Sequence, residues 1–140
     1  MNRLALQQLN KAYGHDALEA AVYGASPVGL IVMLYDGAIT ALRKAQIEIR
    51  NGNFIEKGRL LGKGLDIING LDTVLNLEKG GEVTANLRDL YGYMKQRLGV
   101  ANMKNDPAII DEQIRLLEDL VSAWRQLEKM QEQGQAAGKV

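Results

Sequence analysis

The sequence contains no cysteine, which excludes disulfide bonds and thiol chemistry and leaves the redox compartment undefined. It also carries no net charge, because 17 basic side chains balance 17 acidic ones. A balanced chain offers no electrostatic reason to bind nucleic acid, an anionic membrane surface or a charged substrate.

Long hydrophobic runs are missing as well. No stretch reaches the roughly 18 apolar residues of a membrane span, so we expect no insertion into a membrane. Near the N-terminus, Gln7, Gln8, Asn10 and Lys11 interrupt the apolar core that a signal peptide needs. Apolar residues make up 46% and charged residues 24% of the 140 positions, a composition typical of one folded domain. The prediction is a globular protein of the cytoplasm.

The usual signatures of enzymes are also absent. His15 is the single histidine, and beside Asp16 it is more simply a solvated side chain than a catalytic group or a metal ligand. The sequence has no Glu-x-x-His pair, no glycine-rich phosphate loop and no Gly-x-Ser-x-Gly elbow. We therefore expect no enzymatic activity, no cofactor and no metal. An enzyme built on Tyr13, His15 or Asp36 is the least favoured alternative.

The stretch from Ser26 to Ile49 predicts a long helix around which the rest of the chain is organised. Ser26 can cap the first turn, and Pro27 fits the first helical position. Apolar residues then recur at three- and four-residue spacing, at Ile31, Leu34, Ala38, Leu42, Ala45 and Ile49. A second apolar line runs through Leu30, Met33, Ala41 and Ile47. The helix is too apolar to stand alone in water, so other segments are expected to cover it.

Three further helices are predicted after this one. The second begins near Asn53, and the third follows Gly81. The fourth has Asp106 as its cap and Pro107 as its first residue. Short connections make neighbouring helices antiparallel, so the predicted fold is an all-α, antiparallel up-down four-helix bundle.

The expected domain boundaries follow from this pattern. The bundle covers residues 26–130, and residues 1–25 form a mobile N-terminal arm or cap. Residues 131–140 are polar and contain glycine, so we expect a disordered tail.

The first two helices carry more apolar surface than a monomeric bundle needs. The second also contains Gly58, Gly62, Gly64 and Gly70, each of which costs about 1 kcal/mol relative to alanine. Close helix approach or tolerance in a stable bundle explains these glycines most simply, and the alternative is a shallow groove for a partner. The surplus apolar surface requires cover from the arm, from a second copy, or from another protein's helix.

Charged residues give two further expectations. Asp36 interrupts the apolar first helix, so it should lie on a narrow wet face or meet a basic residue at the edge of the bundle. Six basic residues where the first two helices meet predict a small positive patch: Arg43, Lys44, Arg50, Lys57, Arg59 and Lys63. The patch lacks interleaved aromatic residues, so nucleic acid is not an expected partner.

Several motifs together resemble the FliS family of flagellin-specific export chaperones. They are Ala25-Ser26-Pro27, MLYDGA from Met33 to Ala38, Lys44-Ala45, LDII from Leu65 to Ile68, LYGYMKQRLGVANMKND from Leu90 to Asp106, and Trp124. The resemblance spans nearly the whole chain, from about Lys11 to about Leu127, with the motifs in family order.

The resemblance implies a cytoplasmic chaperone that binds the flexible C-terminal segment of flagellin. That segment would become partly helical along hydrophobic grooves of the bundle, and premature polymerisation would be prevented. The complex would then pass to the cytoplasmic domain of the export-gate membrane protein of the flagellar type III secretion system. The arm, with Ala12-Tyr13, is implied in this transfer and in covering the groove of the empty chaperone.

The predicted flagellin-binding groove uses apolar positions of the second and third helices: Leu61, Leu65, Ile68, Leu71, Leu75, Tyr91, Met94 and Leu98. A stripe cannot face both a partner and the core, so several of these positions are expected to be core.

The predicted export-gate contact on the arm consists of Leu9, Tyr13 and Val22. Family members often carry an apolar residue three positions before the tyrosine, where this chain has Asn10, and Leu9 can substitute for it. The alternative function is a generic homodimeric helical adaptor that buries its surplus stripes between two copies.

Overall fold

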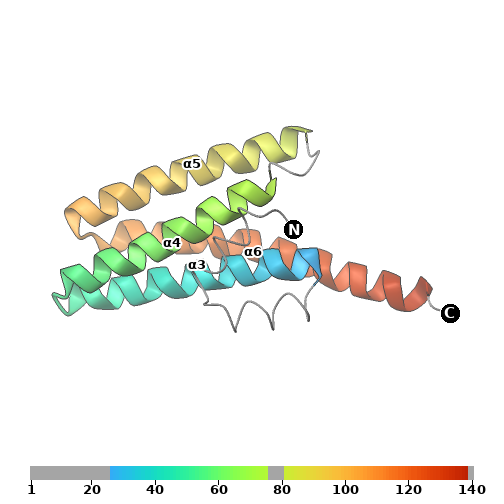
Figure 1. Cartoon of the computed structure of the whole chain (residues 1–140), viewed down its shortest axis with the longest axis horizontal. Helices are drawn as coiled ribbons and strands as arrows, with labels where there is room; N and C mark the ends of the chain where they lie inside the picture. Colours follow the sequence, from blue (N-terminus) through green and yellow to red (C-terminus); the bar gives the residue numbers. More distant parts are fainter. Residues whose placement is uncertain (1–25, 76–80, 139–140) are drawn as a thin grey trace.

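A computed structural model of the chain describes residues 26–75 and 81–138. These residues form four long helices and short connections. Their bounds, in chain order, are α3 Pro27–Arg50, α4 Phe54–Leu75, α5 Gly81–Lys104 and α6 Pro107–Gly138. Helices α3 and α5 each pack against both α4 and α6, and consecutive helices alternate in direction (Figure 1). The described residues contain no strand, and the predicted all-α four-helix bundle is confirmed. The predictions for residues 1–25 lie outside the described part of the chain.

Two helices begin as the sequence predicts. The backbone N–H of Gly29 donates to Ser26 Oγ at 3.0 Å, and Pro27 is the first residue of α3. Proline loses no hydrogen bond there, because the first N–H groups of a helix have no partner within the helix. At the start of α6, a backbone N–H of the first turn donates to Asp106 Oδ1 at 2.9 Å, and Pro107 begins the helix.

Helix α3 is covered along most of its length by α4 and α6. Its completely buried side chains recur at helical spacing: Leu34, Tyr35, Ala38, Leu42 and Ala45. Full burial of one leucine side chain contributes about 1.5–3 kcal/mol, so this row is a large part of the stability of the bundle. The prediction that other helices cover this segment is confirmed.

Packing explains the presence of one glycine in α4. A Cβ atom on Gly64 would lie 3.0 Å from Leu42 Cδ2 of α3, so the missing side chain permits close approach of the two helices. A Cβ atom on Gly58 or Gly62 would meet nothing within 4 Å. These two glycines are therefore tolerated in a stable helix, without a packing role.

The structure corrects the expected tail. Helix α6 continues to Gly138, whereas the polar composition predicts disorder from residue 131. Figure 1 shows this end of α6 extending beyond the other helices. Residues 131–134 are exposed, so the core does not hold them. Glutamine, glutamate and alanine have good helix propensity, and extending an existing helix needs no new nucleation.

Three aromatic side chains from different helices are hydrogen-bonded inside the bundle. Trp124 Nε1 of α6 donates to Tyr35 Oη of α3 at 3.2 Å, and Tyr35 Oη is also hydrogen-bonded to Tyr91 Oη of α5. Burial raises the pKa of both phenols, because it disfavours the charged phenolate. The network is complete only when α3, α5 and α6 are all in place.

Removal of the Tyr35 hydroxyl, which is central to the network, should lower the free energy of unfolding more than removal of the Tyr91 hydroxyl at its end. Tyr35→Phe leaves Tyr91 Oη buried without a partner, which costs about 1–3 kcal/mol, and also removes the hydrogen bond of half-buried Trp124 Nε1. Tyr91→Phe keeps the bond from Trp124 to Tyr35, so we expect a loss of about 1 kcal/mol. Urea unfolding followed by circular dichroism measures both values.

The matched control for these variants is Tyr93→Phe. Tyr93 is 42% exposed, so its loss of a hydroxyl should change the free energy of unfolding by less than about 0.5 kcal/mol. Equal costs for Tyr35→Phe and Tyr93→Phe would contradict a stabilising role of the buried network.

Candidate protein-binding site

The predicted groove residues of α4 and α5 lie mostly in the core. Six of the side chains are at most 2% exposed: Leu61, Ile68, Leu71, Tyr91, Met94 and Leu98. They belong to the cluster that all four helices build, so a partner cannot reach them while the bundle stays closed. Their contact with a partner stays a prediction, and it requires the bundle to open.

The remaining predicted site residues have other positions. Leu65 is half-buried and packs against the edge of the core. Leu75 is the last residue of α4, and its side chain lies outside the described part of the chain. The predicted arm contacts, Leu9, Tyr13 and Val22, also lie outside the described residues, so their role stays a prediction.

A groove of about 490 Å³ runs along the contact between α5 and α6. Leu90 and Tyr93 of α5 form its apolar lining together with Ala108 and Leu116 of α6. Leu90 and Leu116 are half-buried, because one side of each packs against the core and the other faces the groove. Its lining residues on α6 extend over about three helical turns, from Ala108 to Asp119, which suits an elongated partner.

The apolar lining continues beyond the groove along the same two helices. Leu87 lies one turn before Leu90, while Leu120 and Trp124 follow Leu116 at one-turn intervals. All of them are half-buried against the core. The N-terminal end of α5 stands away from α6 (Figure 1), so α6 covers this end of the row less closely. We call the row the α5–α6 seam and define it by five residues: Leu87, Leu90, Leu116, Leu120 and Trp124.

Charged side chains border the seam. Asp111, Glu112, Arg115 and Asp119 line the groove, and Arg115 Nε lies 3.0 Å from Asp111 Oδ2. Tyr93 Oη donates to Glu112 Oε1 at 2.8 Å, and this bond to a carboxylate raises the pKa of the phenol. These groups are largely exposed, so each pair contributes at most about 1 kcal/mol and is screened by salt. The main contribution of the seam to binding is therefore apolar.

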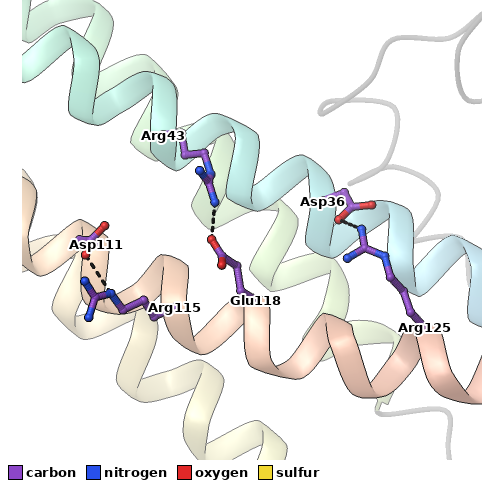
Figure 2. A network of polar contacts seen from close by, with 6 residues as sticks. All are labelled: Asp36, Arg43, Asp111, Arg115, Glu118 and Arg125. Atoms are coloured by element: carbon purple, nitrogen blue, oxygen red, sulfur yellow. Dashed lines mark hydrogen bonds and ion pairs between the residues drawn. The ribbon is translucent and has the colours of Figure 1, made fainter.

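Two ion pairs join α3 to α6. Arg125 pairs with Asp36, and Arg43 pairs with Glu118 (Figure 2). The side chain of Asp36 is 47% exposed and accepts a hydrogen bond from Arg125. The expectation of a wet face or a basic partner for Asp36 is confirmed. The ion pair with Arg125 therefore holds the Asp36 carboxylate at the edge of the bundle.

Leu116 is a seam residue that periodicity alone does not identify. It directly precedes Leu117, which is completely buried, just as Leu90 directly precedes buried Tyr91. Neighbouring residues of a helix differ by about 100° around its axis, so one member of each pair fills the core and the other reaches the edge. Doubled apolar positions are therefore one sequence signal for seam residues, and they occur at Leu90, Leu116 and Leu120.

The described residues contain no group of three or more histidine, cysteine, aspartate or glutamate side chains that could hold a metal ion. In the same ranges, no helix is long and apolar enough to cross a membrane.

Aspartate substitutions should distinguish core residues from seam residues by their effect on the stability of the bundle. Ile68→Asp or Met94→Asp places a carboxylate without a partner in the core, and the bundle should lose most of its helicity. Leu90→Asp or Leu116→Asp places the carboxylate at a half-exposed edge, and the helical signal should stay close to that of the parent. Thermal melts followed by circular dichroism make the comparison. An Ile68→Asp variant as stable as Leu90→Asp would contradict the burial of the α4 stripe.

Comparison with known proteins gives a consistent family. The family model for the flagellar protein FliS matches residues 9–131. The flagellar secretion chaperone FliS of Salmonella typhimurium is 46% identical over 118 residues, which cover 84% of this chain and 87% of the relative. The FliS proteins of Escherichia coli and Bacillus subtilis are 38% and 32% identical, covering 83% and 88% of this chain and 86% and 88% of the relatives. These relatives are named as chaperones and not as enzymes. Because the family model matches most of the chain and the relatives are more than 30% identical over more than four-fifths of it, the chain belongs to the FliS family of flagellar secretion chaperones.

Proposed function

We propose that this chaperone binds the flexible C-terminal segment of flagellin in the cytoplasm and prevents its premature polymerisation. It then delivers flagellin to the cytoplasmic domain of the flagellar export-gate membrane protein. The observation that carries the proposal is the α5–α6 seam, a row of five apolar side chains that the bundle leaves half-covered.

An apolar row suits a partner that is disordered before it binds. Such a segment loses conformational entropy when it becomes ordered, and burial of apolar area offsets this cost. The seam runs along two helices, so it fits an amphipathic helix whose apolar residues recur every three or four positions. Because the chaperone has no net charge, its affinity for the flagellin segment should depend little on salt concentration.

Calorimetric titration tests the seam with a peptide of roughly the last 40 residues of flagellin from the same organism. We expect a one-to-one complex with a micromolar or lower dissociation constant and a negative heat-capacity change, the mark of apolar burial. Combining Leu90→Asp with Leu116→Asp should weaken binding by about tenfold to hundredfold, because two apolar contacts are lost.

The matched control combines Ile55→Asp with Met103→Asp. Both residues are largely exposed, at 94% and 80%, and neither belongs to the seam, so binding should be unchanged. Equal weakening by the control pair would contradict the seam as the binding surface. A folded dimer that binds no flagellin peptide would replace the chaperone mechanism with the homodimeric adaptor.

Delivery to the export gate has a separate test. Tyr13→Ala should leave the affinity for the flagellin peptide unchanged and reduce the amount of flagellin exported, because the arm acts after binding. Calorimetry and the quantity of extracellular flagellin measure the two effects. Normal export and motility with Tyr13→Ala would contradict a role of the arm in delivery.

A further inference from the structure

A second groove, of about 360 Å³, runs along the contact between α3 and α4. Gly37, Thr40 and Ala41 of α3 and Leu60 of α4 are among its lining residues. Ala41 and Leu60 are buried at 2% and 4% exposure, whereas Thr40 is exposed. Met33 of α3 also lines the groove. From Gly37 to Ala41 the α3 lining residues have a small side chain or none, so another backbone can approach α3 closely there.

Positive side chains border this groove. Lys44 of α3 and Arg59 and Lys63 of α4 are among its lining residues. Within the described part of the chain, neither lysine has a hydrogen bond or an ion pair, while Arg59 pairs with exposed Glu56. Asp36 is the one carboxylate among the lining residues, and its charge is already matched by Arg125. The lining therefore has a surplus of positive charge.

The structure divides the positive patch that the sequence predicts. Arg43 pairs with Glu118 of α6 on another side of α3. Lys57 is 6% exposed and donates to the backbone oxygen of Asn102 at 3.0 Å and to Asn105 Oδ1 at 2.7 Å, which ties α4 to the end of α5. These two cations have structural partners, whereas Lys44 and Lys63 have none among residues 26–75 and 81–138.

This groove and the α5–α6 seam belong to opposite pairs of helices. Helix α3 packs against α4 and α6, and α5 packs against the same two helices, so α3 and α5 lie diagonally across the bundle. A partner on the α3–α4 groove would leave the seam accessible. The two surfaces also differ in charge, since three carboxylates and one arginine border the seam, whereas three cations and one carboxylate border the α3–α4 groove.

We propose that the α3–α4 groove is a second docking surface, which takes an acidic helical segment of another protein. Carboxylates at three- or four-residue spacing would face Lys44 and Lys63, and small residues of the same segment would lie over Gly37 and Ala41. Charge complementarity and the small residues Gly37, Thr40 and Ala41 of α3 favour such a segment. No aromatic side chain is among the described lining residues, which disfavours stacking of nucleic-acid bases. The proposal does not depend on flagellin binding at the seam.

A peptide probe tests the groove directly. The probe is an alanine-based helix of about 15 residues with glutamates along one face, and its counterpart has lysine at every glutamate position. Because the chain has no cysteine, Thr40→Cys gives one site for an environment-sensitive fluorophore beside the groove. We expect the glutamate peptide to change the fluorescence and the lysine peptide to have no effect. Binding of the glutamate peptide should weaken as salt rises.

Charge reversal locates the binding. Lys44→Glu combined with Lys63→Glu should weaken binding of the glutamate peptide by about tenfold or more, because like charges then face each other. The matched control is Lys104→Glu combined with Lys129→Glu, which reverses two exposed lysines outside the groove and should leave binding unchanged. Circular dichroism confirms that both variants are folded.

Several results would overturn the proposal. One is equal binding of the two peptides, and another is an equal effect of the groove variant and the control variant. A dimer that becomes a monomer with the groove variant would assign the groove to a second copy of this chain. Failure of the glutamate peptide to bind the folded parent protein would also overturn the proposal.

Discussion

Burial of α3 is the constraint on which the rest of the structure depends. Its completely buried side chains recur along the helix and need cover from more than one neighbour. Helices α4 and α6 supply that cover, and Gly64 permits α4 to come close. The hydrogen bonds among Tyr35, Tyr91 and Trp124 then join α5 and α6 to α3. The ion pairs between α3 and α6 are exposed, so they help to orient the two helices and add little to the free energy of unfolding.

Among the four described helices, α5 has the fewest buried residues, and the proposed function depends on that property. Its buried side chains lie between Tyr91 and Ala101. The part of the helix before Tyr91 presents only edges to the core, through Leu87 and Leu90. A chaperone must hold an apolar segment without losing its own fold, and apolar side chains at the edge of a complete core meet both needs.

The sequence predicts the helices well because their ends depend on local chemistry. Ser26-Pro27 and Asp106-Pro107 act through hydrogen bonds and dihedral angles within a few residues, and both helix starts are confirmed. The binding surface is harder to predict, because periodicity identifies an apolar face without saying what covers it. Ile68 and Leu90 both lie on apolar stripes, yet only the packing of the other helices makes one core and the other edge. The C-terminal end of α6 is helical through helix propensity and not through packing, so its polar composition wrongly predicts disorder.

Hydrogen exchange of the chaperone, with and without the C-terminal peptide of flagellin, tests the central claim most directly. Exchange reports local opening of the backbone, and a bound segment slows it where the helices are least covered. The account predicts new protection in the first half of α5 and in the part of α6 from Leu116 to Trp124, with α3 and α4 unchanged. Protection confined to α3 and α4, or faster exchange throughout the core, would contradict a seam that binds its partner while the bundle stays closed.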